Sequence, residues 1–339
     1  AAGLKVYDAF SRYAPEDLVN CDTFLAIDKI LINWIVARLL AEDVGAKLDD
    51  LTIPQICEKR SKMHFGGKTA GCYQMLESAF QLIQAGNYRC PDRFKDIISR
   101  YQEEDFRMDY EYRRFYSAYD RLEDSADFES LRGLVENIYT NEYLETLLPK
   151  WNHAIMEPDA FTVVPMQRDF YARNLKNAKE RIVVIISDAL RYEVGKELFF
   201  RMQDDPKCTA KLEVQLSVLP SYTRLGMAAL LPHNDLELTD DFKVLLDGQP
   251  CDNLSEREAV LRKYSPDSVC VRFDDIKSLR IADLRNIFTG KQVVYVYHNQ
   301  IDARGAKRPT EDEVFVACEE ALSEIIDLIH RISTSANTY

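Results

Sequence analysis

Short apolar runs rich in β-branched residues recur between helical patterns after Pro149, and they constrain the fold more than any other feature of the sequence. Four such runs stand out, at residues 181–187, 212–219, 268–273 and 292–298. Runs of this length are typical of strands buried on both faces of a parallel sheet. Helical patterns alternate with them, at residues 190–202, 223–231, 255–264 and 313–332. The alternation predicts an α/β fold, with a mostly parallel sheet and flanking helices.

The first part of the chain shows helical patterns alone. Apolar side chains recur at helical spacing at Phe24, Ile27, Leu31, Trp34 and Ile35, and again at Tyr112, Phe115, Tyr116 and Tyr119. A chain of 339 residues is long enough for about two domains of roughly 150 residues each. We therefore predict an all-helical domain over 1–150, a connector over 151–178 and the α/β core over 179–339.

The balance of charge bears on nucleic-acid binding. A net charge of −13 argues against a broad electrostatic grip on nucleic acid, although a local basic pocket or a metal ion could still hold a phosphate. The segment Phe106–Tyr119 interleaves aromatic residues with arginines, a combination that can stack bases. Because acidic residues lie in and beside the same segment, we favour a core face next to a salt-bridged face.

Cysteine usage and the apolar segments bear on the compartment. The eight cysteines are scattered without a Cys-x-x-Cys pair, which predicts free thiols in a reducing cytoplasm. No signal-peptide pattern is found, and charged residues interrupt the most apolar stretch, residues 24–40. We therefore expect a buried helix over 24–40 and a cytoplasmic protein that does not enter a membrane.

Polar residues follow three of the predicted strands, at the edge where an open parallel sheet binds its ligands. Asp188 follows the first strand, where it could bind a hard metal ion or could cap the next helix. Thr223 follows the second, at a helix N-terminus that favours an alkoxide, and its alternative role is also that of a cap. Arg224 beside it could clamp a phosphate or could be a surface charge.

His298 and Asp302 follow the last predicted strand, and both residue types bind metals. A lone histidine at a strand end is more often a hydrogen-bonded structural residue. No G-x-G-x-x-G segment follows the first strand, and no P-loop sequence occurs. These absences count against a plain nucleotide-binding domain.

Three segments together resemble one known family. They are Val184-Ile-Ile-Ser-Asp-Ala-Leu-Arg-Tyr-Glu193, Leu219-Pro-Ser-Tyr-Thr-Arg-Leu-Gly-Met-Ala-Ala-Leu-Leu-Pro232 and Tyr297-His-Asn-Gln-Ile-Asp302. In this order they are similar to the PglZ family, which resembles the alkaline phosphatase superfamily and belongs to the BREX type of bacterial phage-defence system. The resemblance covers roughly residues 100–339. It implies that the core at 179–339 is alkaline-phosphatase-like and incomplete at its C-terminal end.

The resemblance implies metal-dependent hydrolysis of a phosphomonoester or phosphodiester, nucleic acid included. By the resemblance, Thr223 is the nucleophile and also contacts metal, and Asp188 and Asp302 are metal ligands. From its residue type and place at a strand end, His298 is a further candidate metal ligand, and we expect Arg191 or Arg224 to bind the phosphate. Two divalent ions, Zn²⁺ or Mn²⁺, are implied for the intact protein, where they would activate the nucleophile and neutralise the transition state. Implied partners are other BREX proteins, such as the DNA methyltransferase.

Two departures from the family pattern point to a weak site. Relatives are expected to carry Gly-Asp where this chain has Gly305-Ala306, so either this protein lacks that ligand or Ala306 is an engineered change. A further strand with an Asp and a His ligand is expected beyond Tyr339. Because metal affinity follows the number and geometry of ligands, we expect this chain alone to be a poor catalyst. The alternative function is that of an inactive structural subunit of a BREX complex.

Overall fold

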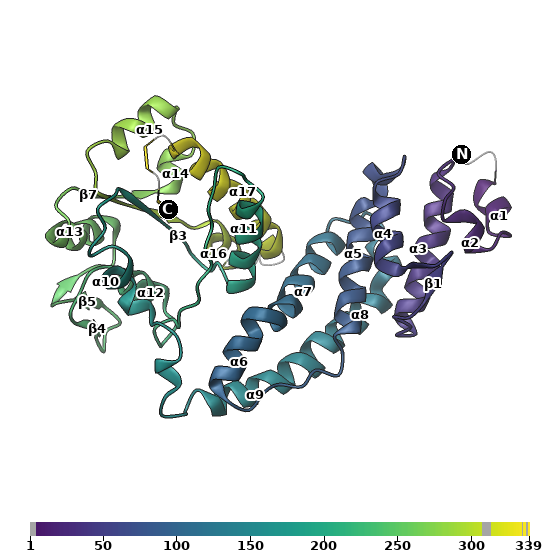
Figure 1. The fold of residues 1–339 in the computed structure, drawn as a ribbon, viewed down its shortest axis with the longest axis horizontal. Helices are drawn as coiled ribbons and strands as arrows, with labels where there is room; N and C mark the ends of the chain where they lie inside the picture. The colour runs from purple at the N-terminus through teal and green to yellow at the C-terminus, as the bar shows by residue number, and fades with distance from the viewer. Residues whose placement is uncertain (1–4, 307–312, 334, 337) are drawn as a thin grey trace. The chain divides into compact units, whose positions relative to one another are not determined.

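The computed structural model describes residues 5–306, 313–333, 335–336 and 338–339. The chain divides into two compact units, Ala1–Glu157 and Pro158–Tyr339 (Figure 1). The first unit is built of helices and the second of a parallel sheet between helices. Among the described residues, no helix combines the length and the apolar character needed to cross a bilayer.

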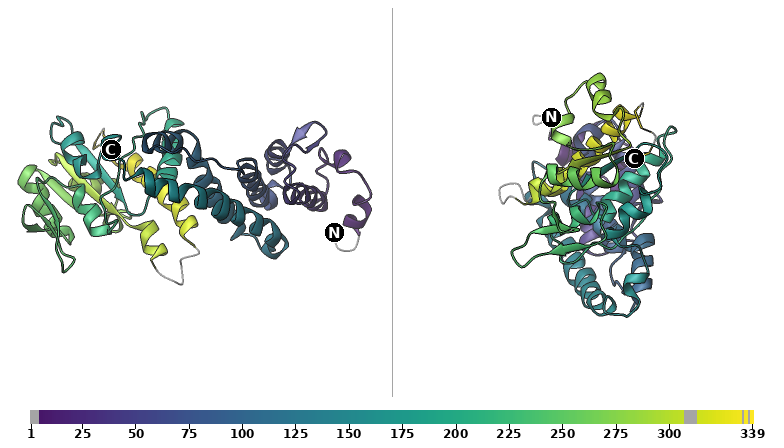
Figure 2. Two further views of the ribbon diagram at one scale, coloured as in Figure 1. Left: turned by 90° about the horizontal axis from the view of Figure 1, so that it is seen from below. Right: turned by 90° about the vertical axis from the view of Figure 1, so that its left-hand side faces the viewer.

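The first unit consists of helices and one short hairpin (Figure 2). Its longer helices are α3 (Leu25–Leu40), α4 (Ile53–Ser61), α5 (Gly66–Gln84), α7 (Phe106–Tyr119), α8 (Glu129–Asn137) and α9 (Glu145–Ala154). Its shorter ones are α1 (Val6–Phe10), α2 (Pro15–Leu18), α6 (Phe94–Arg100), the π-helical η2 (Tyr101–Asp105) and η4 (Ile138–Leu144), and the 3₁₀ turn η3 (Ser125–Phe128). Strand β1 (Lys47–Leu48) pairs antiparallel with β2 (Leu51–Thr52).

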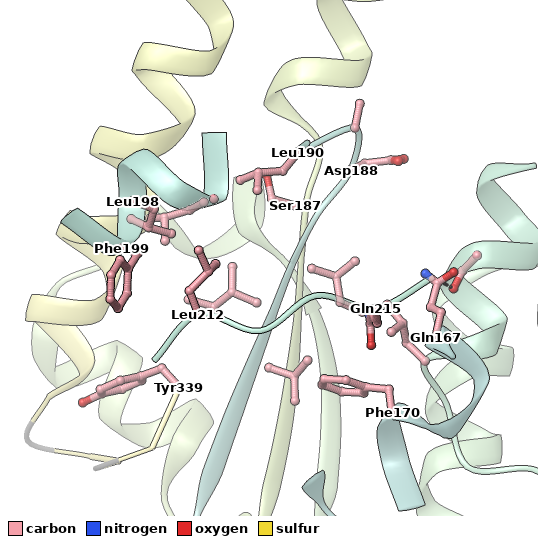
Figure 3. A pocket seen from close by; sticks show the side chains of 18 of the residues that line it. Gln167, Phe170, Ser187, Asp188, Leu190, Leu198, Phe199, Leu212, Gln215 and Tyr339 are labelled. Atoms are coloured by element: carbon pink, nitrogen blue, oxygen red, sulfur yellow. Dashed lines mark hydrogen bonds between the residues drawn. The ribbon is translucent and has the colours of Figure 1, made fainter. Parts of the chain in front are cut away.

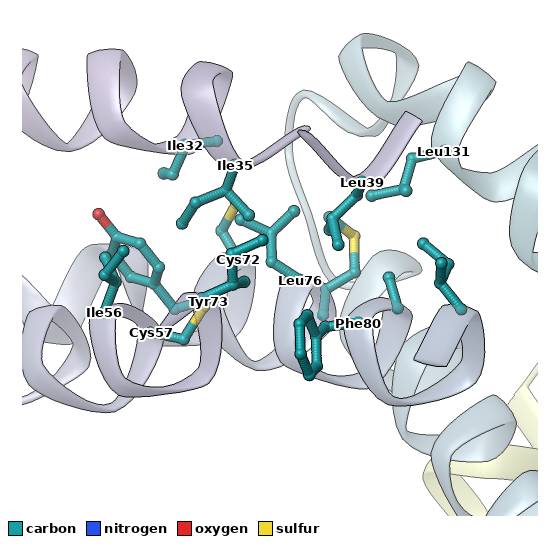
Figure 4. Packing of buried hydrophobic residues seen from close by; sticks show 14 of the residues in the cluster. Ile32, Ile35, Leu39, Ile56, Cys57, Cys72, Tyr73, Leu76, Phe80 and Leu131 are labelled. Carbon is teal, nitrogen blue, oxygen red and sulfur yellow. The ribbon is translucent and has the colours of Figure 1, made fainter. Parts of the chain in front are cut away.

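The predicted apolar faces of the first unit are confirmed. Ile27 and Ile35 of α3 are fully buried, and α3 packs on α5, which contributes Tyr73 and Leu76 to the same core (Figure 4). Phe115 of α7 is also fully buried. Since the aromatic segment of α7 lies in this core, its aromatic residues serve packing rather than an exposed stacking surface.

A charged pair lies inside the same helical core. The Nη2 atom of Arg60 lies 2.8 Å from Oδ1 of Asp28, and both side chains are almost completely buried. The Tyr73 hydroxyl donates to the same carboxylate at 2.7 Å, and Arg60 also donates to the main-chain oxygen of Cys21 at 2.7 Å. The contacts tie α3, α4 and α5 to the segment before α3.

The second unit has a three-stranded parallel sheet in the order β3-β8-β7. These strands are β3 (Ile182–Ser187), β7 (Ser268–Arg272) and β8 (Val293–His298). All six residues of the central strand β8 are buried. The predicted α/β fold with a parallel sheet is confirmed, and three of the four predicted strands form it.

Helices cover both faces of this sheet (Figure 1). On one face lie α10 (Phe170–Asn174), α12 (Thr223–Ala229) and α13 (Leu254–Tyr264). On the other lie α14 (Phe273–Ile276), α15 (Ile281–Phe288) and α17 (Val314–Ile332), and α17 also packs on α11 (Tyr192–Gln203). The 3₁₀ turns η5 (Ala160–Thr162) and η6 (Gln167–Asp169) precede α10, and α16 (Gln300–Gly305) follows β8.

The prediction of a sheet strand over 212–219 is wrong. The segment is extended, but its hydrogen bonds go to a different partner: Leu216 N donates to Pro165 O at 2.9 Å and Gln167 N donates to Leu216 O at 2.8 Å. An antiparallel sheet of β4 (Leu236–Leu238), β5 (Val244–Leu246) and β6 (Gln249–Pro250) was not predicted. All eight cysteines are free, and six of them are buried.

The buried Asp28–Arg60 pair gives a prediction about stability. Replacing Asp28 with Leu leaves the buried Arg60 guanidinium without its counter-ion, so the free energy of unfolding should fall by about 3–5 kcal/mol in urea denaturation. The double variant Asp28→Leu/Arg60→Met should recover most of this loss. As a control, Glu58→Ala removes only the exposed Glu58–Lys62 pair and should leave the free energy of unfolding almost unchanged. Equal losses in the single and double variants would contradict the prediction.

Candidate functional site

The strand ends of β3 and β8 meet at one edge of the sheet. The parallel register sets Ser187 opposite His298, and the N–H of Asp188 donates to the main-chain oxygen of His298 at 2.9 Å. Ser187 and Asp188 lie together at the end of β3 (Figure 3). The predicted site residues at these two strand ends are therefore neighbours.

The turn after Asp188 is strained and does not cap a helix. Ala189 has a φ of +62°, in the left-handed region that residues with a Cβ enter at a cost of roughly 1–2 kcal/mol. Helix α11 begins only at Tyr192, with Arg191 as its N-cap residue. Asp188 therefore lies outside the capping position, and the turn leaves its carboxylate half-buried at the sheet edge.

A cavity of about 1050 Å³ opens beside this edge. Its lining includes Asp188, Thr223 and Asp302, which lie far apart in the sequence. The rest of its wall comes mainly from the edge of β3, from apolar side chains of α11 such as Leu198 and Phe199, and from the extended segment through Leu212 and Gln215 (Figure 3). The structure thus brings three of the predicted site residues to one cavity.

The negative charge of Asp302 acts on the Asp188 carboxyl in this cavity. Burial raises the pKa of Asp188, and the negative charge of Asp302 raises it further. The N–H of Ala189 and the positive charge of Arg257 act in the opposite direction and lower it. Because like charges lie close together here, the site favours a bound cation or a proton over two bare carboxylates.

Thr223 is the first residue of α12, and the preceding Tyr222 is the N-cap residue. The Thr223 side chain is exposed at the cavity. Gln167 holds this end of the helix, because its Nε2 donates to Gly226 O at 3.1 Å and its Oε1 accepts from Val218 N at 3.2 Å. Sequence reasoning missed Gln167, since nothing in its local pattern indicates a contact with α12.

The two predicted phosphate-binding arginines lie outside the cavity lining. Arg191 is exposed at the start of α11, and Arg224 is exposed with its Nη1 3.9 Å from Oδ1 of Asp252. A third arginine, Arg257 of α13, is buried and was not singled out from the sequence. It donates to the main-chain oxygens of Cys251 and Asp252 and stacks over the Tyr297 ring at 5.1 Å. The positive charge of Arg257 lowers the pKa of Asp188.

His298 is buried and both of its ring nitrogens have partners. Nδ1 lies 2.9 Å from Oγ of Ser187, and Nε2 lies 2.9 Å from Oε2 of Glu324 on α17. The ring also packs edge-on against Phe273 at 4.7 Å. This geometry matches the structural alternative for a histidine at a strand end, since neither nitrogen points freely toward a metal.

The oxygen atoms at the cavity suit a hard divalent cation. Asp188, Asp302 and Thr223 would supply two carboxylates and a hydroxyl, and Mg²⁺-like ions are often held by one or two carboxylates with water and substrate oxygens. Within the described part of the chain, no group of three or more His, Cys, Asp or Glu side chains is arranged to hold a metal. Ala306 lies one turn after Asp302, with its N–H bonded to Asp302 O at 2.9 Å. The donor set therefore fits one weakly held ion.

The Asp188–Asp302 repulsion can be tested by removing one charge. Asp302→Asn should lower the pKa of Asp188, as measured by carboxyl ¹³C NMR, because the neighbouring negative charge is lost. The melting temperature should rise at neutral pH and the gain should fade on acidification, since protonation of Asp188 already relieves the repulsion. The stabilisation should stay below about 1 kcal/mol because Asp188 is only half-buried. The exposed Asp283→Asn serves as the control, and an unchanged Asp188 titration in Asp302→Asn would disprove the coupling.

Comparison with known proteins identifies the family of the second unit. Residues 169–339 match the family described as the BREX system PglZ alkaline phosphatase-like domain. The alkaline phosphatase-like protein PglZ of Bacillus cereus (strain H3081.97) is 34% identical over 340 residues, which cover 97% of this chain and 39% of that protein. The alkaline phosphatase-like protein BrxZ of Escherichia coli O9:H4 (strain HS) is 32% identical over 352 residues, which cover 98% of this chain and 40% of that protein.

No solved structure matches the chain. The chain spans about two fifths of the length of the two curated relatives. The family match includes both strand ends and the three residues Asp188, Thr223 and Asp302 that share one cavity. This chain therefore belongs to the PglZ family of alkaline phosphatase-like proteins of BREX systems.

Proposed function

We propose that this chain carries part of the active site of a metal-dependent phosphoesterase, in which Thr223 attacks phosphorus while Asp188 and Asp302 hold a divalent cation. The observation that supports the proposal most directly is the shared cavity, because three side chains from separate elements converge on it. The whole protein would act within a BREX phage-defence system on a phosphomonoester or phosphodiester, DNA included.

Alkaline phosphatase-like proteins generally depend on metal ions. When bound, such an ion would lower the pKa of the Thr223 hydroxyl and neutralise charge on the phosphoryl group. Oxygen donors fit Mn²⁺ readily, whereas Zn²⁺ would also accept nitrogen ligands. We propose two ions for the intact protein, and Asp188 and Asp302 as ligands from this chain.

The chain's own residues would orient the phosphoryl group. Thr223 is exposed at the cavity, so its oxygen can approach phosphorus. Thr223 begins α12, whose first helical hydrogen bond runs from Gly226 N to Tyr222 O, so its side chain is carried by an ordered turn. Attack would form a bond from Thr223 Oγ1 to phosphorus and break the bond to the leaving group, and water would then hydrolyse the phosphothreonine.

A second function, that of a catalytically inactive structural subunit, is favoured by one feature. Ala306 lies one turn after Asp302, where a carboxylate would complete a set of three, and its methyl group cannot bind metal. In that case the core would serve assembly with other BREX proteins, such as the DNA methyltransferase. Metal binding and the effect of residue 306 distinguish the two functions.

The variant Ala306→Asp tests this choice. It adds a carboxylate at the C-cap residue of α16, one turn after Asp302, so Mn²⁺ affinity measured by electron paramagnetic resonance should rise about tenfold or more. Asp188→Ala should abolish the binding in the same background. The matched control is Ala303→Asp, which adds the same charge to α16 at a position next to Asp302 in sequence but not one turn away. Equal gains from Ala303→Asp and Ala306→Asp would contradict a built ligand site.

The nucleophile is tested in the full-length protein. Thr223→Val should reduce hydrolysis of p-nitrophenyl phosphate or bis-p-nitrophenyl phosphate by at least about 1,000-fold, because valine has no oxygen that could attack phosphorus. Thr223→Ser should retain measurable activity. Ser221→Ala, in the same cavity wall, is the control and should stay within a few-fold of the unmodified protein. Full activity in Thr223→Val would disprove the assignment.

A further inference from the structure

We propose that helix α17 is the positioning element of this site, with Glu324 acting through His298 and Glu320 acting through α16 to fix Asp188 and Asp302. Its consequence for metal binding rests on the proposed function, whereas the positioning itself rests on hydrogen bonds alone. His298 is then a positioning residue rather than a metal ligand.

The first contact of α17 is a hydrogen-bonded chain of three side chains. Glu324, as a carboxylate, accepts a hydrogen bond from the Nε2–H group of His298 at 2.9 Å. With that hydrogen on Nε2, the corresponding tautomer has Nδ1 as an acceptor, and the Ser187 hydroxyl 2.9 Å away would donate to it. The chain therefore fixes the ring tautomer with the proton on Nε2 and ties the end of β3 to α17.

The main chain of His298 makes a second hydrogen bond to the end of β3. Its carbonyl oxygen accepts from the N–H of Asp188 at 2.9 Å. One residue thus binds the side chain of Ser187 and the backbone of Asp188. A displacement of the His298 main chain would therefore carry the backbone of Asp188 with it.

Glu320, one turn earlier on α17, holds the segment that carries the other carboxylate. It accepts from Nε2 of Gln300 at 2.9 Å and pairs with Arg304. These two residues flank Asp302 on the short helix α16. Glu320 therefore holds α16, which carries Asp302, through two side chains, and Glu324 holds His298, the residue that contacts Ser187 and Asp188.

Hydrogen bonds that fix the positions of Asp188 and Asp302 matter here because the two negative charges repel each other. Outer hydrogen bonds of this kind orient ligands before the ion arrives, and losing one typically weakens metal binding roughly 10- to 100-fold. The strained turn at Ala189 adds to the need, since it lies directly after Asp188. Without these contacts, the end of β3 could move so as to relieve both the charge repulsion and the strained backbone of Ala189.

The helix supplies its own matched control. Glu319 lies on α17, has a side chain 29% exposed against 28% for Glu324, and pairs with Arg201 of α11 at 2.6 Å. Glu319→Ala and Glu324→Ala change the charge of the same helix equally. Only Glu324→Ala breaks the chain to Ser187.

The positioning is measured first without metal. In the unmodified chain, ¹⁵N NMR of the imidazoles should show His298 with its proton on Nε2. Glu324→Ala should change that pattern and speed hydrogen exchange of the Asp188 amide by about tenfold, whereas Glu319→Ala should leave both unchanged. Glu324→Gln should rescue the exchange rate in part, since its amide oxygen still accepts from Nε2. Equal exchange rates in the two alanine variants would overturn the proposal.

Mn²⁺ titration supplies the second readout. The dissociation constant should rise roughly 10- to 100-fold in Glu324→Ala and stay within about twofold in Glu319→Ala. Zn²⁺ loading that shifts the His298 nitrogens to metal-bound values would overturn the positioning role. If neither the unmodified chain nor Asp188→Ala binds Mn²⁺, the proposed function fails, and the exchange and tautomer measurements still decide the positioning.

Discussion

The parallel pairing of β3 with β8 is the constraint on which the second unit depends. The register sets Ser187 against His298, so both strands end at one level and both chains turn away there. Along β8, Val294 and Val296 face one helical layer while Tyr295 and Tyr297 face the other. A slip by one residue would exchange these faces and expose the wrong side chains to each layer. The packing of the whole unit therefore fixes which residues reach the sheet edge.

The same constraint creates the electrostatic character of the site. Because the chain leaves both strands at one edge, Asp188 and Asp302 come close enough for their charges to repel. The first unit handles buried charge differently, since its Asp28 has a counter-ion and a hydroxyl donor within hydrogen-bond distance. The Asp28 charge is already neutralised by Arg60, whereas two neighbouring carboxylates at an open cavity are stabilised when a cation binds between them. The contrast supports a binding role for the second unit.

The sequence predicted the elements better than it predicted their partners. The runs at 181–187 and 292–298 were recognisable as buried strands because almost every side chain in them is apolar, and the polar residues after them marked the edge. The run at 212–219 is extended as expected, but local periodicity does not say which backbone it pairs with, and Leu216 bonds to the segment before α10. Gln167, Arg257 and Glu324 were missed for a related reason. Each acts through a contact with residues far away in the sequence, and no spacing rule reports such contacts.

For His298, the sequence motif alone does not distinguish a metal ligand from a structural hydrogen-bond partner. A histidine at a strand end, four residues before an aspartate, is compatible with two roles, metal ligand and structural hydrogen-bond partner. Only the surroundings of the ring distinguish these roles. Here the ring is buried between Ser187 and Glu324, which lies 26 residues further along the chain. Such an arrangement holds Asp188 near a like charge, which costs free energy unless a cation occupies the cavity. Under the proposed function, a bound cation would offset the repulsion between the two carboxylates that these contacts hold at the cavity, even with alanine at position 306.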